Sequence, residues 1–196
     1  MLTNEELERV VKKNLPRALF RHSLAVAKFS AQLGRRFGWN PDLAFRAGLL
    51  HDWAKPWSPR KLVKYIRANK VKVPGFQFGL KYAPAVLHSY AGAAEVKRRG
   101  WLNDPRAIRA VASHTMGRPG MSLPEKILYV ADVASPDRTF SGAKGIYQTA
   151  LKSLDLAYLA SVALKISYVL CHGRPLHPLT LRVWNAALQI KARGVK

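Results

Sequence analysis

Four histidines and two aspartates lie in segments where apolar neighbours would bury them. These residues are His22, His51, Asp52, His88, His114 and Asp132. A buried carboxylate costs several kcal/mol unless a cation or hydrogen bonds compensate it. Imidazole and carboxylate groups are ligands that iron, manganese and zinc accept in proteins. One buried histidine is more often a hydrogen-bonded core residue than a ligand. Six such side chains, one or two on each of five segments, instead predict a metal centre built between helices.

These side chains need helices to position them, and apolar residues recur at the three- and four-residue spacing typical of helices. We expect helices over 19–38, 40–52, 61–69, 83–99, 103–114 and 122–132, with two or three more between 144 and 193. The adjacent pair His51-Asp52 can serve one metal only where a helix ends, since successive helical residues point about 100° apart. The segment 71–82, with one proline and two glycines, is expected to be a loop. No period-two alternation indicates strands, so the prediction is an all-α, single helical domain over 1–196, with its core at about 16–190.

The composition excludes several classes of protein. A chain of 196 residues with one cysteine, Cys171, needs no disulfide framework and fits a reducing, cytoplasmic location. We expect Cys171 to be a core thiol. The first residues lack an apolar core of signal-peptide length, and no run approaches eighteen uncharged apolar residues. A membrane-spanning, secreted or disordered protein is therefore not expected.

The net charge is unusually positive. The chain has 33 Lys and Arg against 11 Asp and Glu, a formal net charge of +22. Eight bases and no acid lie between Glu8 and Asp42, and eight more lie between Asp52 and Glu95. Such a field attracts polyanions, so non-specific polyanion binding is one expectation. The alternative is that these bases only solvate helix faces.

The order of the ligand candidates resembles a known family. His22, then His51-Asp52, then Asp132 match the H…HD…D order of the HD-domain phosphohydrolases. Two further segments, HTMGRPGMSLPEKILYVAD from His114 and PDRTFSG from Pro136, are more specific. They resemble the symmetrical bis(5'-nucleosyl)-tetraphosphatases of that superfamily. The resemblance extends over residues 16 to 190.

The resemblance implies a fold, a cofactor and an activity. The fold is a single HD-domain helical bundle. The cofactor is one or two divalent metal ions, with iron expected and manganese or another transition metal as the alternative. Members of this family cleave dinucleoside tetraphosphates such as diadenosine tetraphosphate symmetrically, into two nucleoside diphosphates. The implied partner is therefore a small dinucleoside polyphosphate and not a membrane.

The resemblance also implies roles for individual residues. The primary metal ligands would be His22, His51, Asp52 and Asp132. His88 and His114 would bind a second metal or face the phosphates, and Asp52 could bridge two ions. Catalysis would rest on Asp52, Lys55, His88 and His114. Substrate contacts would come from Lys55, His88, His114, Arg118, Arg138, Pro175, Leu176 and His177.

Two alternatives remain open from the sequence. The same ligand set could serve an HD-type phosphohydrolase that acts on other nucleotides or phosphoesters. The chain could instead be a basic, nucleic-acid-binding helical module whose histidines are structural. The oligomeric state is also open, with a homodimer as one alternative.

Overall fold

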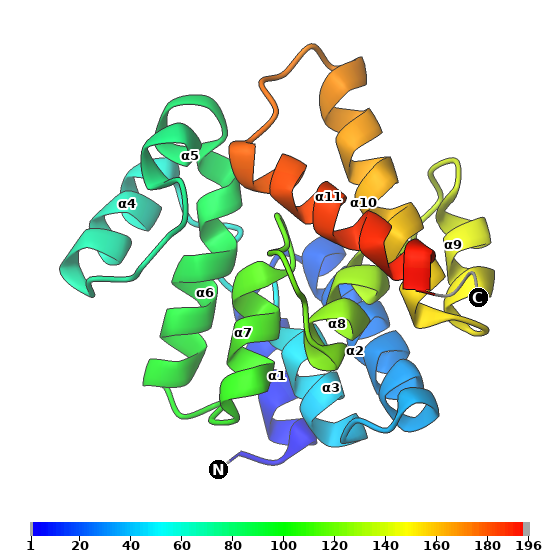
Figure 1. Ribbon diagram of the computed structural model, residues 1–196. Coiled ribbons are helices and arrows are strands. Elements are labelled where there is room, and N and C mark those ends of the chain that lie inside the picture. Colours follow the sequence, from blue (N-terminus) through cyan, green and yellow to red (C-terminus); the bar gives the residue numbers. More distant parts are fainter. Residues whose placement is uncertain (1, 194–196) are drawn as a thin grey trace.

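The computed structural model describes residues 2–193 and contains only helices and loops over that range (Figure 1). The helices are α1 (Asn4–Asn14), α2 (Arg17–Phe37), α3 (Pro41–Leu50), α4 (Pro59–Ala68), α5 (Phe76–Tyr82), the short 3₁₀ helix η1 (Pro84–Val86), α6 (Leu87–Arg98), α7 (Pro105–Ser113), α8 (Leu123–Ala134), α9 (Ala143–Ala150), α10 (Leu154–Cys171) and α11 (Pro178–Arg193). The all-α prediction is confirmed.

Polar caps define where the helices that carry the site begin. The Asn40 side chain accepts hydrogen bonds from the backbone N–H groups of Asp42 and Leu43, which would otherwise lack partners in the first turn of α3. Ser122 and Glu125 form a capping box at the start of α8. These caps fix the register in which the later residues of each helix face the core.

Close packing of α2 against α3 brings two of the histidines together. Gly48 of α3 lies against α2 so tightly that a Cβ atom there would stand 2.6 Å from the Cα of Ala27. Real Cβ atoms do not approach backbone that closely, so only glycine allows this contact. His51, three residues after Gly48, therefore lies beside His22, with ring centroids 5.3 Å apart.

The other helices complete the bundle around this pair. α8 packs on α2, α3, α7 and α10, while α6 packs on α7 and α4. One large apolar cluster extends from α1 to α11, and a smaller one holds α4 against α6 through Leu62 and Ile66. In Figure 1, α4 and α5 form the left side of the molecule, and α10 and α11 cover the top.

One helix passes a test of length and apolarity for membrane spans. α10 has 18 residues and a mean hydropathy of 1.6, with 28% of that window buried. The helix nevertheless carries Asp155 and Lys165, and the Lys165 ammonium group donates to the carbonyl of His114 inside the domain. α10 also packs on α8, α9 and α11.

Three expectations for local structure were wrong or incomplete. The segment 71–82 is a loop only in its first part, because Phe76–Tyr82 forms α5 with Gly75 at φ +64° before it. The predicted helix 83–99 begins as a 3₁₀ turn, since η1 precedes α6. Cys171 ends α10 and is exposed, so it is not a core thiol.

Candidate metal centre

Five helices each place one or two of the six side chains at a common centre. His22 lies in the first turns of α2, His88 in the first turn of α6, and Asp132 in the second half of α8. His51 and His114 are the C-cap residues of α3 and α7, and Asp52 follows His51 directly. The expectation that His51-Asp52 stands at a helix end is confirmed.

Three of the histidines share one local arrangement. His51, His88 and His114 each donate from Nδ1 to the carbonyl three residues earlier, on Gly48, Ala85 and Val111. In His51 and His114 this bond satisfies a carbonyl that the end of a helix leaves free. A neutral imidazole that donates from Nδ1 has its lone pair on Nε2. The local backbone therefore points three Nε2 lone pairs at the centre.

His22 is held in the same tautomer, with its lone pair on Nε2, by a carboxylate. Its Nδ1 donates to Asp137 Oδ2 at 2.8 Å, and its Nε2 lies 3.2 Å from Asp132 Oδ1. A carboxylate behind a histidine fixes the tautomer and raises the basicity of the inward nitrogen. This is the arrangement that metal-ligating histidines usually have.

The inward histidine Nε2 atoms and the carboxylate oxygens are all hydrogen-bond acceptors, and they face one another. The Nε2 atoms of His88 and His114 lie 3.1 Å apart, and Asp52 Oδ1 lies 3.0 Å from the Nε2 of His88. His51 Nε2 and Asp52 Oδ1 are buried without a hydrogen-bond partner among the described residues. Lone pairs do not face each other at such distances unless a cation or a proton lies between them. The donor set therefore fits a metal ion, as predicted from the residue types.

The donors divide into two groups that share Asp52. One group is His22, His51 and Asp52, and the other is Asp52, His88 and His114. Within each group the donor atoms lie within 4.8 Å of one another. Asp132 Oδ1 borders the first group, 3.7 Å from His51 Nε2. The division into a primary and a second metal site, with Asp52 between them, stays a prediction.

Positive side chains surround Asp132. The Arg138 guanidinium donates from Nη2 to Asp132 Oδ1 at 2.7 Å and approaches His22 Nε2 at 3.0 Å. Its Nε donates to the Asp132 carbonyl. Lys165 Nζ lies 3.4 Å from Asp132 Oδ2. A cationic group thus stands between two of the expected metal ligands, which is a second sign that this position favours positive charge.

The electrostatics keep the donors in the states that a metal needs. Burial raises the pKa of Asp52, but His51, His114 and His88 outweigh it and hold that pKa well below its ordinary value. Burial likewise raises the pKa of Asp132, and Lys165 and His22 reverse the effect. Burial lowers the pKa of His114 to about 4, against a smaller opposite effect of Asp52. At neutral pH the centre therefore contains ionised carboxylates and a neutral His114.

Three residues at the site were not among the sequence predictions. Asp137 orients His22, Lys165 approaches Asp132, and the Thr115 hydroxyl lies 3.1 Å from His114 Nε2. Lys165 interrupts the apolar run of α10, as Asp132 interrupts that of α8. The signal that identified Asp132 was therefore also present for Lys165.

The remaining predicted residues lie in different settings. Lys55 Nζ donates to Asp52 Oδ2 at 2.7 Å, and half of its side chain is exposed. Pro175 is exposed and Leu176 half-buried, whereas His177 is buried against Gly75 and Phe78 of the α5 segment. The predicted nucleotide contacts of these three residues stay predictions.

Arg118 forms a structural ion pair. Its guanidinium grips the fully buried Glu125 carboxylate with two bonds of 2.6 Å each. Glu125 also accepts from Ser122 and Ser113, which ties the loop after α7 to the start of α8. The same planar edge cannot hold phosphate while it holds Glu125. The phosphate contact predicted for Arg118 stays a prediction that requires this pair to open.

Replacing Arg118 with Ala is expected to destabilise the protein. The change leaves the buried Glu125 charge without its cation, which should cost about 1–2 kcal/mol because the guanidinium is partly solvent exposed. Urea unfolding measures the free energy, with Arg106→Ala as control, since the pair of Arg106 with Asp104 lies at the surface. A variant with unchanged stability but weaker substrate binding would contradict the structural role.

The comparisons with known proteins agree with this geometry. The family model described as HD domain matches residues 19–137, so the chain belongs to the HD domain family. The symmetrical bis(5'-nucleosyl)-tetraphosphatase of Bacillus subtilis is 32% identical over 184 residues, 94% of this chain and 97% of that protein. The enzyme of the same name from Halalkalibacterium halodurans is 30% identical over 92% of this chain and 94% of its own length. Within the HD domain family, the chain is thus grouped with the symmetrical bis(5'-nucleosyl)-tetraphosphatases.

A solved structure shows the same fold. It is the crystal structure of a predicted HD superfamily hydrolase involved in NAD metabolism from Clostridium acetobutylicum. The similarity has a TM-score of 0.89 at 28% identity and covers 97% of this chain and 99% of that one. The expected HD-domain helical bundle is therefore confirmed.

Proposed function

We propose that this protein hydrolyses dinucleoside tetraphosphates, with diadenosine tetraphosphate as the reference substrate, into two nucleoside diphosphates. The observation that carries the proposal is the set of inward Nε2 and carboxylate donors that face one another at 3.0–3.7 Å. The relatives that bear this activity in their names match over nearly the whole chain, which supports the choice of substrate.

His22, His51, Asp52 and Asp132 would hold the first divalent metal, and His88 and His114 a second ion or the phosphates. A bound divalent metal supplies a Lewis acid that polarises a phosphoryl oxygen and acidifies water. Iron is the metal that the family resemblance implies, with manganese as the alternative; mixed imidazole and carboxylate donors accept both.

The chain itself must position the substrate and offset its charge, because phosphoryl transfer depends mainly on positioning and electrostatic stabilisation. Lys55 is half exposed beside Asp52, so its ammonium can meet a phosphate at the edge of the centre. Arg138 is held by its Nε on the Asp132 carbonyl, which leaves the Nη2 edge aimed at the centre. Together these cations would stabilise the charge that develops on the phosphate oxygens.

His88 and Thr115 line the opposite side of Asp52. The Thr115 hydroxyl lies 3.1 Å from His114 Nε2 and 3.5 Å from His88 Nε2. We assign His88 and His114 to the substrate phosphates when one metal is present. We also propose a cytoplasmic location and a homodimer. The roles given to the site residues do not depend on either.

The test is hydrolysis of diadenosine tetraphosphate by purified protein of measured metal content. We expect ADP as the single product. ADP should form when iron or manganese is bound, and its formation should stop after treatment with a chelator. Chromatography of the products decides between symmetrical and asymmetrical cleavage. ATP plus AMP would overturn the proposed reaction, and full activity of the metal-free protein would overturn the assigned centre.

A further inference from the structure

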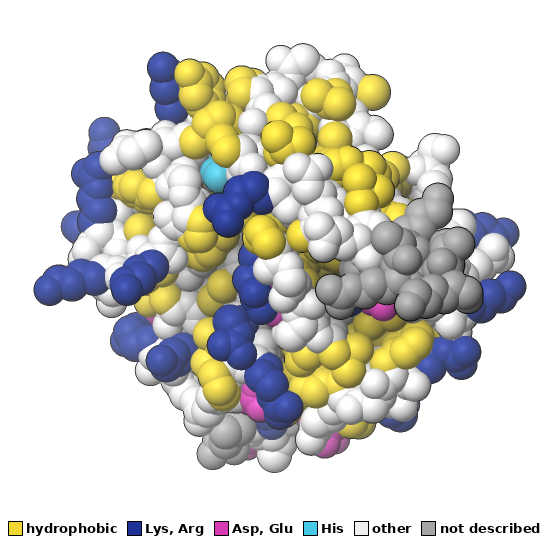
Figure 2. Space-filling view, viewed as in Figure 1, with side chains coloured by type: hydrophobic (Ala, Val, Ile, Leu, Met, Phe, Trp, Pro, Cys, Tyr) yellow, Lys and Arg dark blue, Asp and Glu magenta, His cyan; other side chains and the backbone are white. Residues whose placement is uncertain are grey.

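The surface around α4 carries an excess of positive charge that the metal centre does not use. Seven exposed bases lie on α4, the following loop and α5: Arg60, Lys61, Lys64, Arg67, Lys70, Lys72 and Lys81. The chain has no acid between residues 53 and 94. Figure 2 shows Lys and Arg side chains gathered over the α4 side of the molecule. We call these seven residues the α4 surface.

The charges of the α4 surface have no carboxylate partners. In the described range 2–193, no acidic oxygen lies within 4.0 Å of any of its seven cations. Other bases of the chain are paired, such as Arg98 and Arg99 with Glu95 and Arg106 with Asp104. Uncompensated like charges repel one another, so a bound polyanion would stabilise this surface.

A groove runs along the α4 surface. It has a volume of about 620 Å³ and lies between α4 and the segment of α5 and η1. Its lining is mostly apolar and comes from Val63, Leu80 and Pro84 together with the hydrocarbon stems of the exposed residues Arg60, Lys64 and Arg67. The three cations are spaced four and three residues apart, so they lie in one row on α4. At 1.5 Å per residue the row is about 10 Å long.

The dimensions of the row match a nucleic-acid strand. Neighbouring cations in the row are about 6 and 4.5 Å apart along α4. This spacing is comparable to that of successive phosphates along the backbone of one strand, so each of the three cations can face one phosphate. The apolar lining of the groove offers a surface for sugars and base faces. An apolar groove edged by one row of cations suits a single strand, because the bases of a single strand are free to pack on an apolar lining, whereas a duplex stacks its base faces inside.

We propose that the α4 groove binds the backbone of single-stranded nucleic acid. The contacts would be independent of sequence, because Lys and Arg read phosphates and not bases. None of the residues that line the groove is a ligand candidate of the metal centre. A strand bound in the groove therefore leaves the centre unoccupied.

The test is fluorescence anisotropy with a labelled twelve-nucleotide oligouridylate RNA, measured over a range of salt concentrations. The groove variant combines Arg60→Gln, Lys64→Gln and Arg67→Gln, all at exposed positions. We expect it to bind at least about tenfold more weakly. The slope of log affinity against log salt should fall by about 2, since each lost phosphate contact on a single strand removes about 0.7.

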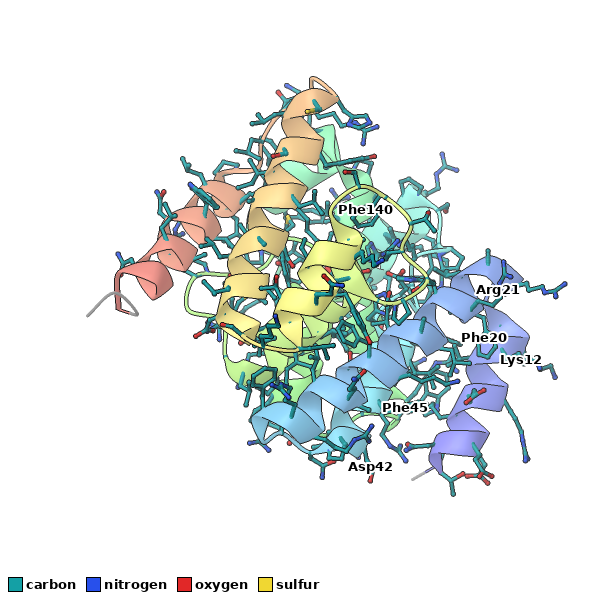
Figure 3. All side chains as sticks on the ribbon, turned by 90° about the vertical axis from the view of Figure 1, so that its right-hand side faces the viewer. Lys12, Phe20, Arg21, Asp42, Phe45 and Phe140 are labelled. Carbon is teal, nitrogen blue, oxygen red and sulfur yellow. The ribbon has the colours of Figure 1, made fainter. Side chains whose placement is uncertain are left out.

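A matched control distinguishes binding in the groove from non-specific electrostatic attraction of RNA to the basic protein. The control variant combines Lys12→Gln, Lys13→Gln and Arg35→Gln, which remove the same charge from exposed positions on α1 and α2 (Lys12 in Figure 3). We expect this variant to keep nearly wild-type affinity. Equal loss in both variants, or no loss in the groove variant, would overturn the proposal.

Two further probes distinguish other polyanions. A duplex of the same length and phosphatidylserine vesicles are added under the same conditions. Tighter binding of the duplex than of the single strand would overturn the proposal. The same holds if the groove variant loses vesicle binding but keeps RNA binding. Strand binding needs no added metal, so a failure of hydrolysis does not change this result.

Discussion

Replacing Asp52 with Asn is expected to remove bound metal and to lower the turnover of diadenosine tetraphosphate by about 10³-fold or more. Asp52 belongs to both donor groups, and its two oxygens face His51 and Lys55 on one side and His88 on the other. A metal ion contributes several kcal/mol of charge stabilisation in the transition state. Each 1.36 kcal/mol corresponds to a factor of ten in rate.

Metal analysis and steady-state kinetics measure these two effects. Asp155→Asn is the matched control, because Asp155 is an exposed aspartate that pairs with Lys126 away from the centre. Circular dichroism should show that both variants keep the helical fold, since asparagine has nearly the volume of aspartate. A D52N protein with full metal content and full turnover would show that the assigned centre is wrong.

Much of the fold followed from local signals in the sequence. The Asn40-Pro41 and Ser122–Glu125 caps are visible in the residue types, and both helices begin where these caps predict. α5 was missed because Pro74, Gly75 and Gly79 all favour loops locally. Packing overrides that preference, since Gly79 is buried against Leu87. The exposure of Cys171 could not be predicted either, because it depends on where α10 projects beyond the bundle.

The sequence identified those site residues that are polar but lie in apolar segments, where they would be buried. His22, His51 and Asp132 stood out because a polar group in an apolar run needs a partner from elsewhere in the fold. Asp137 lies in a loop with no such conflict, and only the folded chain brings it to His22 over 115 residues of separation. Arg118 lies in a loop that a sequence cannot orient, so its bond to the buried Glu125 became visible only in the structure.

The loop between α8 and α9 places Arg138 at the centre from one side, while its exposed Phe140 points outward (Figure 3). The Nη2 group of Arg138 contacts Asp132 Oδ1 and His22 Nε2, the same atoms that we expect to hold a metal. The single lone pair of His22 Nε2 cannot serve both cations at once, whereas Asp132 Oδ1 has a lone pair for each. Metal binding should therefore free the Nη2 edge for a substrate phosphate while Nε keeps its bond to the Asp132 carbonyl.

Replacing Arg138 with Ala is thus expected to damage catalysis and to spare metal binding. Loss of one charge-assisted hydrogen bond to phosphate costs about 1.5–3 kcal/mol, which lowers kcat/KM by about 10–150-fold. KM should rise and kcat should fall together, because the contact holds the bound substrate and becomes stronger as charge develops on the phosphate in the transition state. Arg138→Lys should recover only part of this loss, since an ammonium cannot hold the carbonyl and grip phosphate in one plane.

Metal affinity separates this role from that of a residue that only supports the ligands. Because Arg138 competes for the single lone pair of His22 Nε2, the alanine variant should bind metal at least as tightly as the wild type. Titration of metal-free protein with iron or manganese measures this affinity. If the variant binds metal more weakly and its kcat/KM recovers with excess metal, Arg138 positions Asp132 and does not contact the substrate.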